Sequence, residues 1–205
     1  MDIRAILRSP NIYIAIQWLV GGMYVRNACL KLINAQAGER VLDIGCGPAY
    51  YVKKMPPVEY FGFDTNYRYI KYARSRFSSY GTFYCKEFTE EHAKSLGKFD
   101  CVILMGLLHH LDDSECSQLL TLIRSVLVPS GRVVALDTTV HNRQHPLSRF
   151  IATSDRGNYV RQPAEYMKLA EFSFESVTGE CPTAWWFPSI FWCMQLQKPR
   201  PDQAC

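Results

Sequence analysis

A glycine turn between two apolar segments constrains this chain more than any other feature. Residues 41–49, VLDIGCGPA, begin as an apolar run and then turn at Gly45 and Gly47, which predicts a buried strand followed by a turn where backbone can approach a ligand closely. A second apolar run, residues 60–63, ends at Asp64, which follows Gly47 by 17 residues. A spacing of roughly 20 residues between turn and carboxylate is typical of a nucleotide-binding βαβ unit, in which the carboxylate binds the ribose.

Asp43 distinguishes this turn from that of a dinucleotide site. It precedes the first glycine by two residues, and the last glycine of a dinucleotide pattern would fall at Tyr50. A carboxylate at this place would repel a pyrophosphate, which the N-terminus of a helix otherwise attracts. The residues therefore favour a nucleoside that carries positive charge and no phosphate, and a nicotinamide-dependent oxidoreductase is disfavoured.

With these features, residues 41–139 resemble the class I S-adenosylmethionine-dependent methyltransferases of the small-molecule type. Their first motif is similar to VLDIGCGPA, although Ala49 stands where many members have a third glycine. The likeness continues, in the order and spacing of the family, through FGFDTN, FYCKEF, FDCVILMGLLHHLDD and LVPSGRVVALDTT. The resemblance implies an α/β, Rossmann-like sheet of seven strands, mostly parallel with an antiparallel last strand, with helices on both faces and an extra N-terminal helix. It also implies S-adenosylmethionine as the cofactor.

Bulk composition is that of one ordinary globular domain. The chain has 205 residues, of which 48% are hydrophobic and 20% charged. Its net charge of +4 gives no support for a nucleic-acid partner. The eight cysteines include no C-x-x-C pair and no zinc-like cluster. The Asp-plus-Asp-Asn arrangement of magnesium-dependent catechol methyltransferases is also missing, so no metal is expected. Because no secretory signal is visible, a cytoplasmic location is expected.

The domain organisation follows from changes in residue pattern. Residues 1–38 are expected to form an N-terminal helical segment, residues 39–198 the methyltransferase domain and residues 199–205 a frayed tail. Residues 140–162 are expected to be a substrate-side insertion. Within the first segment, residues 12–25 are too short an apolar run to span a membrane, which needs about 20 residues. A helix packed on the domain, a lid over the cofactor and a helix on a membrane surface remain the alternatives.

Strands and helices alternate in the predicted secondary structure, as in a doubly wound sheet. Strands are expected at residues 40–44, 60–63, 82–85, 99–105, 132–136, 174–178 and 190–197. Helices are expected from residue 10 to about 35 and at residues 49–55, 67–77, 90–96, 112–127, 146–152 and 164–172. A turn at residues 129–131, Pro-Ser-Gly, is expected to lead into the fifth strand.

The resemblance assigns the first half of the cofactor site to the glycine turn and the end of the second strand. Asp43 is placed to meet the amino group of the methionine moiety, while Gly45 and Gly47 allow close approach of the backbone. Asp64, with Thr65 beside it, is expected to bind the ribose, because a carboxylate has two oxygens to accept from two hydroxyls. For either carboxylate, a purely local role in capping or turn formation is the alternative.

The adenine and sulfur ends are assigned to the third and fourth strands. Glu87 matches the acidic residue that contacts the adenine amino group in the family, and Phe88 would cover the adenine face. The alternative is that Lys86 and Glu87 form a solvated charge pair. Met105 ends the fourth strand at the carboxyl edge of the sheet, where ligands bind in open α/β folds, and is expected to line the sulfur side.

Three histidines are candidate catalytic residues. Methyl transfer from a sulfonium needs a general base only when the nucleophile must lose a proton, and histidine suits that role near neutral pH. His109 and His110 follow the fourth strand, and His141 follows the fifth. The alternative for the first two is packing against the next helix, and the sequence offers no ground to choose among the three.

The insertion at residues 140–162 carries a local excess of positive charge. Arg149, Arg156 and Arg161 are therefore candidates for binding a phosphate or carboxylate of the substrate. A solvated loop whose charges bind nothing is the alternative. Aromatic residues 185–187 would form a wall for a flat substrate, or else core or a dimer contact.

These features predict an enzyme that methylates a small molecule, most simply at oxygen of an anionic, sugar-like or natural-product acceptor. The alternatives are methylation at carbon or nitrogen of a lipid or quinone near a membrane, and a protein that binds S-adenosylmethionine without methylating. Methylation of nucleobase amino groups is disfavoured, because Met-Gly-Leu-Leu stands where [DNS]-P-P-[YFW] would be expected. Membrane contact is disfavoured, and homodimerisation is left open.

Overall fold

The computed structural model describes residues 22–142, 144–153, 157–182 and 190–201. Within them lies a seven-stranded sheet with the order β3-β2-β1-β4-β5-β7-β6. The strands are β1 (Arg40–Ile44), β2 (Glu59–Phe63), β3 (Thr82–Tyr84), β4 (Phe99–Met105), β5 (Leu127–Thr138), β6 (Phe174–Glu180) and β7 (Phe191–Pro199). The helices are α3 (Gly22–Ile33), α4 (Tyr67–Phe77), α5 (Glu90–Leu96), α6 (Asp113–Val126), α7 (Pro146–Thr153) and α8 (Pro163–Glu171). Two short 3₁₀ turns are η1 (Val52–Lys54) and η2 (Leu108–His110).

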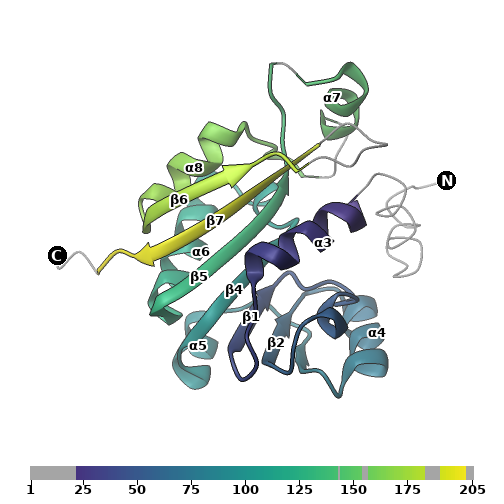
Figure 1. Cartoon of the computed structure of the whole chain (residues 1–205), viewed down its shortest axis with the longest axis vertical. Coiled ribbons are helices and arrows are strands. Elements are labelled where there is room, and N and C mark those ends of the chain that lie inside the picture. The colour runs from purple at the N-terminus through teal and green to yellow at the C-terminus, as the bar shows by residue number, and fades with distance from the viewer. Residues whose placement is uncertain (1–21, 143, 154–156, 183–189, 202–205) are drawn as a thin grey trace.

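Strand direction confirms the predicted fold class. Strands β1 to β5 pair in parallel, and β7 runs antiparallel between β5 and β6 (Figure 1). The central β4 is an apolar run with six of its seven residues buried, as expected for a parallel strand covered on both faces. The reversal of strand order beside β1 creates the switch point at which ligands bind in such sheets.

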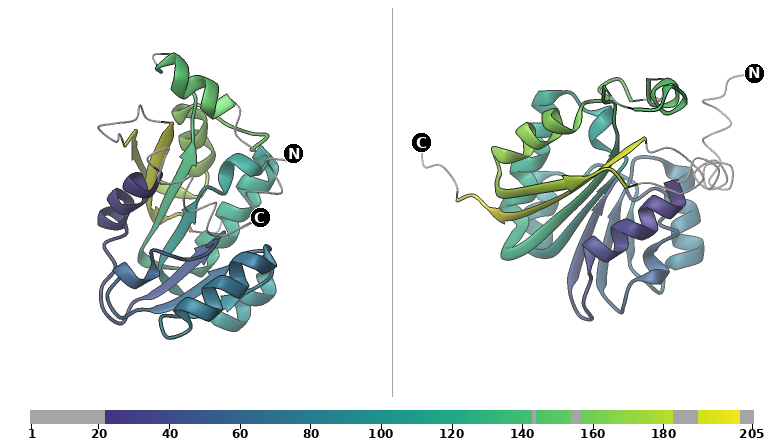
Figure 2. Two further views of the ribbon diagram at one scale, coloured as in Figure 1. Left: turned by 90° about the vertical axis from the view of Figure 1, so that its right-hand side faces the viewer. Right: turned by 45° about the horizontal axis from the view of Figure 1, so that its top comes forward.

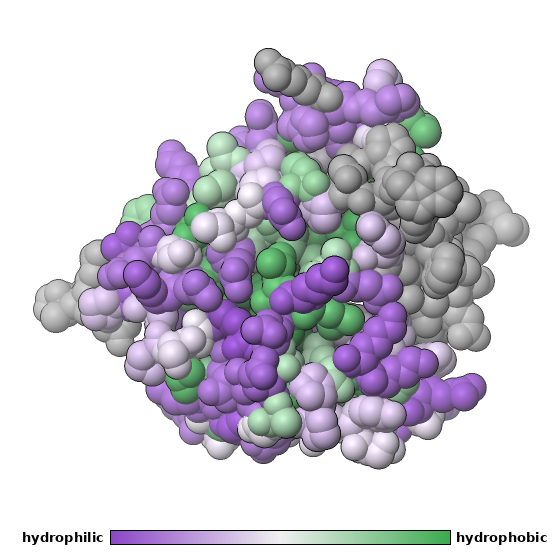
Figure 3. All heavy atoms as spheres, in the orientation of Figure 1, coloured by the Kyte–Doolittle hydropathy of each residue, from purple (hydrophilic) through white to green (hydrophobic). Residues whose placement is uncertain are grey.

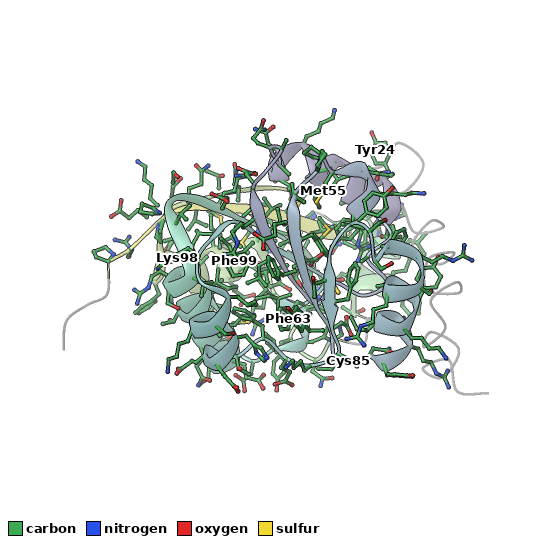
Figure 4. All side chains as sticks on the ribbon, turned by 90° about the horizontal axis from the view of Figure 1, so that it is seen from below. Tyr24, Met55, Phe63, Cys85, Lys98 and Phe99 are labelled. Carbon is green, nitrogen blue, oxygen red and sulfur yellow. The ribbon has the colours of Figure 1, made fainter. Side chains whose placement is uncertain are left out.

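Helices cover the two faces of the sheet as separate layers. One core cluster joins α3 and α4 to the side chains of alternate strand residues such as Val41, Ile103 and Leu136. The other joins α5, α6 and α8 to the opposite set, such as Leu42 and Leu104. Figure 2 shows α3 lying across one face of the central strands, with α6 and α8 behind them. Interior side chains in Figure 4 include Phe63 and Phe99, whereas Tyr24 on α3 points outward.

A half-buried arginine connects several elements at the amino edge of the sheet. Arg132 on β5 donates to the carbonyl oxygens of Ile33 and Asn34, where α3 ends, at 2.5 and 3.0 Å. It also forms a two-pronged ion pair with Glu39 at 2.7 and 3.0 Å. This arginine holds the pKa of Glu39 below its usual value, because it stabilises the ionised carboxylate.

Two details of the predicted secondary structure are wrong. The helix expected at residues 49–55 is only the 3₁₀ turn η1, because Ala49 has a left-handed φ of 50° and a proline pair closes the segment soon afterwards. The turn expected at residues 129–131 lies inside the observed span of β5, where pairing with β4 is interrupted by a register shift between Phe99 and Cys101. Residues 10–21 of the expected first helix lie outside the described part of the chain.

Hydrophilic side chains cover most of the molecular face drawn in Figure 3, and apolar residues come to the surface in a band at its centre. In the described ranges, none of the helices combines the length and the apolar character that crossing a bilayer requires.

Gly62 on β2 tests how tightly the layer under the glycine turn is packed. A Cβ atom there would lie 2.9 Å from Sγ of Cys46 and 3.0 Å from Cδ1 of Phe83. We expect Gly62→Ala to lower the free energy of unfolding by about 1–3 kcal/mol through overpacking, measured by urea denaturation. The control Phe172→Ala, at a side chain that is 80% exposed, should change it by less than about 0.5 kcal/mol. Equal stability of Gly62→Ala and wild type would contradict the packing shown.

Candidate functional site

The carboxyl ends of the parallel strands meet at one edge of the sheet and carry most of the predicted site residues. A cavity of about 1230 Å³ opens there on the side of α5 and α6. Five predicted cofactor-binding residues line it: Gly45, Asp64, Thr65, Glu87 and Phe88. Because small-molecule sites usually occupy roughly 300–1,000 Å³, this cavity has room for a nucleoside.

Asp64 joins the glycine turn to the end of β2. Its Oδ2 accepts from the backbone N–H of Gly47 at 2.9 Å, and its Oδ1 accepts from that of Asn66 at 2.7 Å. Burial raises the pKa of Asp64, and these two backbone bonds act in the opposite direction. Each oxygen retains a further lone pair, so the carboxylate can still accept from a diol.

The glycine turn itself is fixed to β2 by backbone hydrogen bonds. The N–H groups of Gly45 and Cys46 both donate to the carbonyl oxygen of Phe63, at 2.8 and 3.0 Å. Gly45 and Gly47 have φ values of 78° and 55°, which glycine adopts without steric cost. The turn is therefore shaped by its own backbone.

The predicted adenine residues lie at the end of β3. Phe88 is buried and packs edge-on against Phe63, with ring centroids 5.2 Å apart, so part of its surface belongs to the core. Glu87 is exposed at the rim of the cavity. Its neighbour Lys86 places Nζ 5.9 Å from the ring centroid of Tyr84.

Asp43 lies on the opposite face of the sheet from this cavity, because side chains alternate along β1. It is fully buried, and the hydroxyls of Tyr51 and Tyr60 both donate to its Oδ2. Its Oδ1 has no hydrogen-bond partner among the described residues. Burial raises the pKa of Asp43 to about 7, and the two tyrosine hydroxyls partly offset this effect.

Arg26 accompanies Asp43 on this face and was not predicted from the sequence. It belongs to α3, is 5% exposed, and lowers the pKa of Asp43 electrostatically. A Cβ atom built on Gly106 would lie 3.5 Å from its Nη2, so the guanidinium reaches the end of β4. Asp43 and Arg26 together present a carboxyl group and a cation, which fits the amino and carboxylate groups of an amino acid. The buried Met105 lies on the same face.

The structure brings His109 together with Asp137, a second residue that the sequence analysis missed. Nδ1 of His109 lies 2.8 Å from Oδ1 of Asp137, and both side chains are buried. The backbone N–H of His109 donates to the same oxygen at 3.2 Å. The signal that could have found Asp137 is its place at the end of an apolar strand, which is also the place of Asp64.

The orientation of the His109 ring follows from its neighbours. Nδ1 faces Asp137, and Cε1 lies 3.7 Å from where a Cβ on Gly106 would be. On the other side, a Cβ on Gly157 would overlap Cδ2. Since Nε2 lies between Cε1 and Cδ2, it is directed away from Asp137, between the end of β4 and Gly157.

The other two histidines have different settings. His110 is exposed, with its ring centroid 4.2 Å from that of His109. His141 is half-buried after β5, and its backbone N–H donates to Oε1 of Gln144 at 3.3 Å. Of the three candidates, His109 is the one paired with a buried carboxylate.

Two of the three predicted substrate-binding arginines lie in the described part of the chain, and they have different settings. Arg149 is exposed on α7. Arg161 is buried, and its guanidinium donates to Asp113 and to backbone carbonyls. Arg156 and the aromatic residues 185–187 lie outside the described residues.

A family model matches the part of the chain that includes the glycine turn. The model is described as a methyltransferase domain, and the match covers residues 41–131. Over these residues the chain is similar to a methyltransferase domain. The match begins at the first residue of the glycine-turn motif and includes β1 to β4, α6 and the His109 turn. The match is consistent with S-adenosylmethionine, the cofactor expected from the sequence. The arrangement of Asp43, Arg26 and Asp64 around the glycine turn fits its amino acid and ribose groups.

Solved structures share the fold of this chain. Human N-acetylserotonin methyltransferase in complex with SAM is 22% identical, with a TM-score of 0.69 over 96% of this chain and 58% of that one. N-methyltransferase NodS from Bradyrhizobium japonicum WM9 is 15% identical, with a TM-score of 0.65 over 87% and 97%. The S-adenosylmethionine-dependent methyltransferase SibL is 18% identical, with a TM-score of 0.63 over 80% and 51%.

The chain thus spans little more than half the length of two of these proteins. No curated protein matches the chain in sequence.

The raised pKa of Asp43 predicts a pH dependence of stability. Between pH 3.8, where the unfolded carboxyl ionises, and about 7, the folded state holds a proton that the unfolded state has released. The free energy of unfolding therefore falls as pH rises through this window, by about 4 kcal/mol in total, at about 1.4 kcal/mol for each pKa unit.

We expect Asp43→Asn to flatten this dependence of the free energy of unfolding on pH, measured by urea denaturation between pH 4 and 7. The control Glu90→Gln, at a side chain that is 82% exposed, should keep it. An unchanged slope in Asp43→Asn would contradict the assignment.

Proposed function

We propose that the protein transfers the methyl group of S-adenosylmethionine to a hydroxyl oxygen of a small molecule, with His109 as the general base. The observation that carries this proposal is the buried pair of His109 and Asp137 at the carboxyl edge of the sheet, where we expect the cofactor to bind. The family match supports methyl transfer, and the pair supports the choice of oxygen.

Residues on both faces of the sheet would hold the cofactor across the strand ends. Glu87 and Phe88 would receive the adenine, and Asp64 the ribose hydroxyls. Asp43 and Arg26 would hold the amino and carboxylate groups on the face covered by α3. With this order, Met105 and Gly106 would lie beside the sulfonium, and Gly106 is next to the ring of His109. When bound, the cofactor supplies an electrophilic methyl group with a good leaving group.

His109 is suited to take the proton of an attacking hydroxyl. Its Nδ1–H donates to Asp137, which fixes the tautomer so that Nε2 is the nitrogen that accepts a proton. As the acceptor oxygen bonds to the methyl carbon and the carbon–sulfur bond breaks, the hydroxyl proton passes to Nε2. Asp137 then stabilises the imidazolium. A neutral amine attacks through its own lone pair and needs no such base, so this pair favours an oxygen acceptor.

The insertion after β5 supports an anionic class of acceptor. Arg149, which is exposed on α7, supports an acceptor with a carboxylate or phosphate, such as a sugar-like or natural-product intermediate. Arg161 is buried and gives no such support. The fold shared with a methyltransferase for N-acetylserotonin supports a small flat acceptor as a further test compound.

Replacement of His109 tests the role of the base. We expect His109→Gln to lower kcat by about 10²–10⁴-fold, because the hydroxyl loses its proton acceptor. Affinity for S-adenosylhomocysteine, measured by calorimetry, should stay unchanged. The matched control is His110→Gln, at the exposed neighbour, which should retain near wild-type kcat in an assay of S-adenosylhomocysteine release with a panel of hydroxylated acceptors. Loss of activity in the control alone would reassign the base.

Replacement of Asp43 tests the amino acid end of the site. We expect Asp43→Asn to weaken binding of S-adenosylhomocysteine at pH 8 by about tenfold or more, because a charge-assisted hydrogen bond to the ammonium is lost. The isosteric control Asp100→Asn lies at the amino edge, where Asp100 accepts from the backbone N–H of Arg40 at 2.9 Å, and should bind as wild type does. Tight binding by Asp43→Asn would remove Asp43 from the cofactor site.

A further inference from the structure

The guanidinium of Arg161 is buried inside the protein, where it binds the turn that carries His109. The residue is 7% exposed. Its Nη1 donates to the carbonyl oxygen of Leu108 at 2.9 Å, and its Nη2 donates to that of Leu111 at 2.7 Å. Nε and Nη2 also donate to Oδ1 of Asp113, at 2.9 and 2.7 Å. Arg161 therefore binds the backbone immediately before and immediately after His109 and His110.

The segment that contains Arg161, residues 157–161, also lies directly on His109. The backbone N–H of Tyr159 donates to the carbonyl oxygen of His109 at 3.0 Å. Gly157 faces the imidazole so closely that a Cβ atom would overlap Cδ2 and lie 2.9 Å from Cγ. This cover accounts for the 6% exposure of His109.

The same segment is anchored to the strand that carries Asp137. Thr139, two residues after Asp137, forms a parallel bridge with Arg161, and its Oγ1 donates to the carbonyl oxygen of Arg161 at 2.9 Å. The guanidinium carbon also lies 5.7 Å from the ring centroid of Tyr166, whose hydroxyl donates to the carbonyl oxygen of Thr138. Arg161 thus bridges the end of β5 to the turn after β4, the two places that supply the histidine and its carboxylate.

We propose that Arg161 is a positioning residue that acts through His109, by locking the His109 turn and residues 157–161 against the end of β5. This inference rests on the proposed function, since it concerns the base of that reaction. The lock keeps Nδ1 of His109 on Asp137 and directs Nε2 toward the end of β4. It assigns Arg161 a role inside the protein, and not the anion-binding role suggested by its charge.

The chemistry of the side chain explains why an arginine occupies this position. Its planar guanidinium directs several N–H groups in fixed directions, so it can serve two carbonyls and a carboxylate at once. A lysine keeps the charge but presents a single ammonium on a flexible stem. Arg161→Lys is therefore the variant that removes the lock while preserving the charge.

The test follows the Nδ1 proton of His109 in ¹⁵N-histidine-labelled protein by NMR, through its exchange with water. We expect Arg161→Lys to accelerate this exchange by about tenfold or more, because the buried pair opens more often once its covering hydrogen bonds are weakened. The matched control is Arg132→Lys, which disrupts a half-buried arginine at the amino edge that also donates to backbone carbonyls and to a carboxylate. It should leave the exchange of the His109 proton unchanged.

Two results would overturn the proposal. One is a wild-type exchange rate in Arg161→Lys, and the other is equal acceleration in both variants, which would indicate general loosening. If Arg161→Lys does not fold, Asp113→Ala takes its place, because the side chain of Asp113 is 77% exposed and its loss removes only one partner of Arg161. Acceleration in Asp113→Ala above the control supports the lock, and no acceleration overturns it.

The NMR readout needs neither cofactor nor acceptor, so it separates this inference from the proposed function. Once an acceptor is known, Arg161→Lys should lower kcat and alter its pH profile while KM for S-adenosylmethionine stays unchanged. If the proton exchange responds as expected but His109→Gln retains full activity, the lock stands and the proposed base is wrong. If His109→Gln is inactive and the exchange does not respond, the base stands and the lock is wrong.

Discussion

Parallel pairing of the central strands is the constraint on which the rest of the structure depends. Asp43 on β1 is opposite Ile103 on β4, and Met105 on β4 is opposite Leu136 on β5. Because parallel strands finish at the same edge, residues far apart in sequence arrive within reach of one ligand. Each strand then contributes one kind of group: a carboxylate from β1, another after β2, a histidine after β4 and its carboxylate from β5.

The two faces of this edge have different electrostatic character. On the face of α3, Asp43 is buried with two tyrosine hydroxyls and a nearby arginine, and its raised pKa shows that burial outweighs their help. On the other face, Asp64 is bound by backbone N–H groups at the rim of the open cavity. A cationic ligand would compensate the first carboxylate, whereas the second needs only hydroxyl donors. A nucleoside joined to an amino acid satisfies both.

Much of the fold could be predicted from the sequence, because local patterns there were strong. The apolar strand β4 and the amphipathic helix α4 have the bounds that were predicted, residues 99–105 and residues 67–77. The short η1 could not be predicted, since the left-handed φ of Ala49 depends on the turn around it. The expected cofactor residues came from short segments at the glycine turn and at the ends of the next three strands, which the resemblance to the family pointed out. Asp137 and Arg26 were missed because their roles exist only through contacts between distant elements.

Arg161 shows the limit of reasoning from local charge. A cluster of basic residues predicts a surface for anions, yet this guanidinium finds its partners inside, on carbonyls more than 45 residues away in the chain. Sequence alone cannot tell an arginine that meets a substrate from one that holds a loop, because both uses require the same five donors.

The ion pair of Arg132 and Glu39 has a consequence for how a domain of this kind can evolve. Arg132 also donates to the backbone at the end of α3, so these contacts hold α3 to the sheet at the amino edge, opposite the candidate site. Folding and chemistry are therefore supported by separate groups of residues, at the two ends of the same strands. Loops at the carboxyl edge can therefore be replaced during evolution by loops that admit a different acceptor, while the sheet and its contacts at the amino edge stay the same.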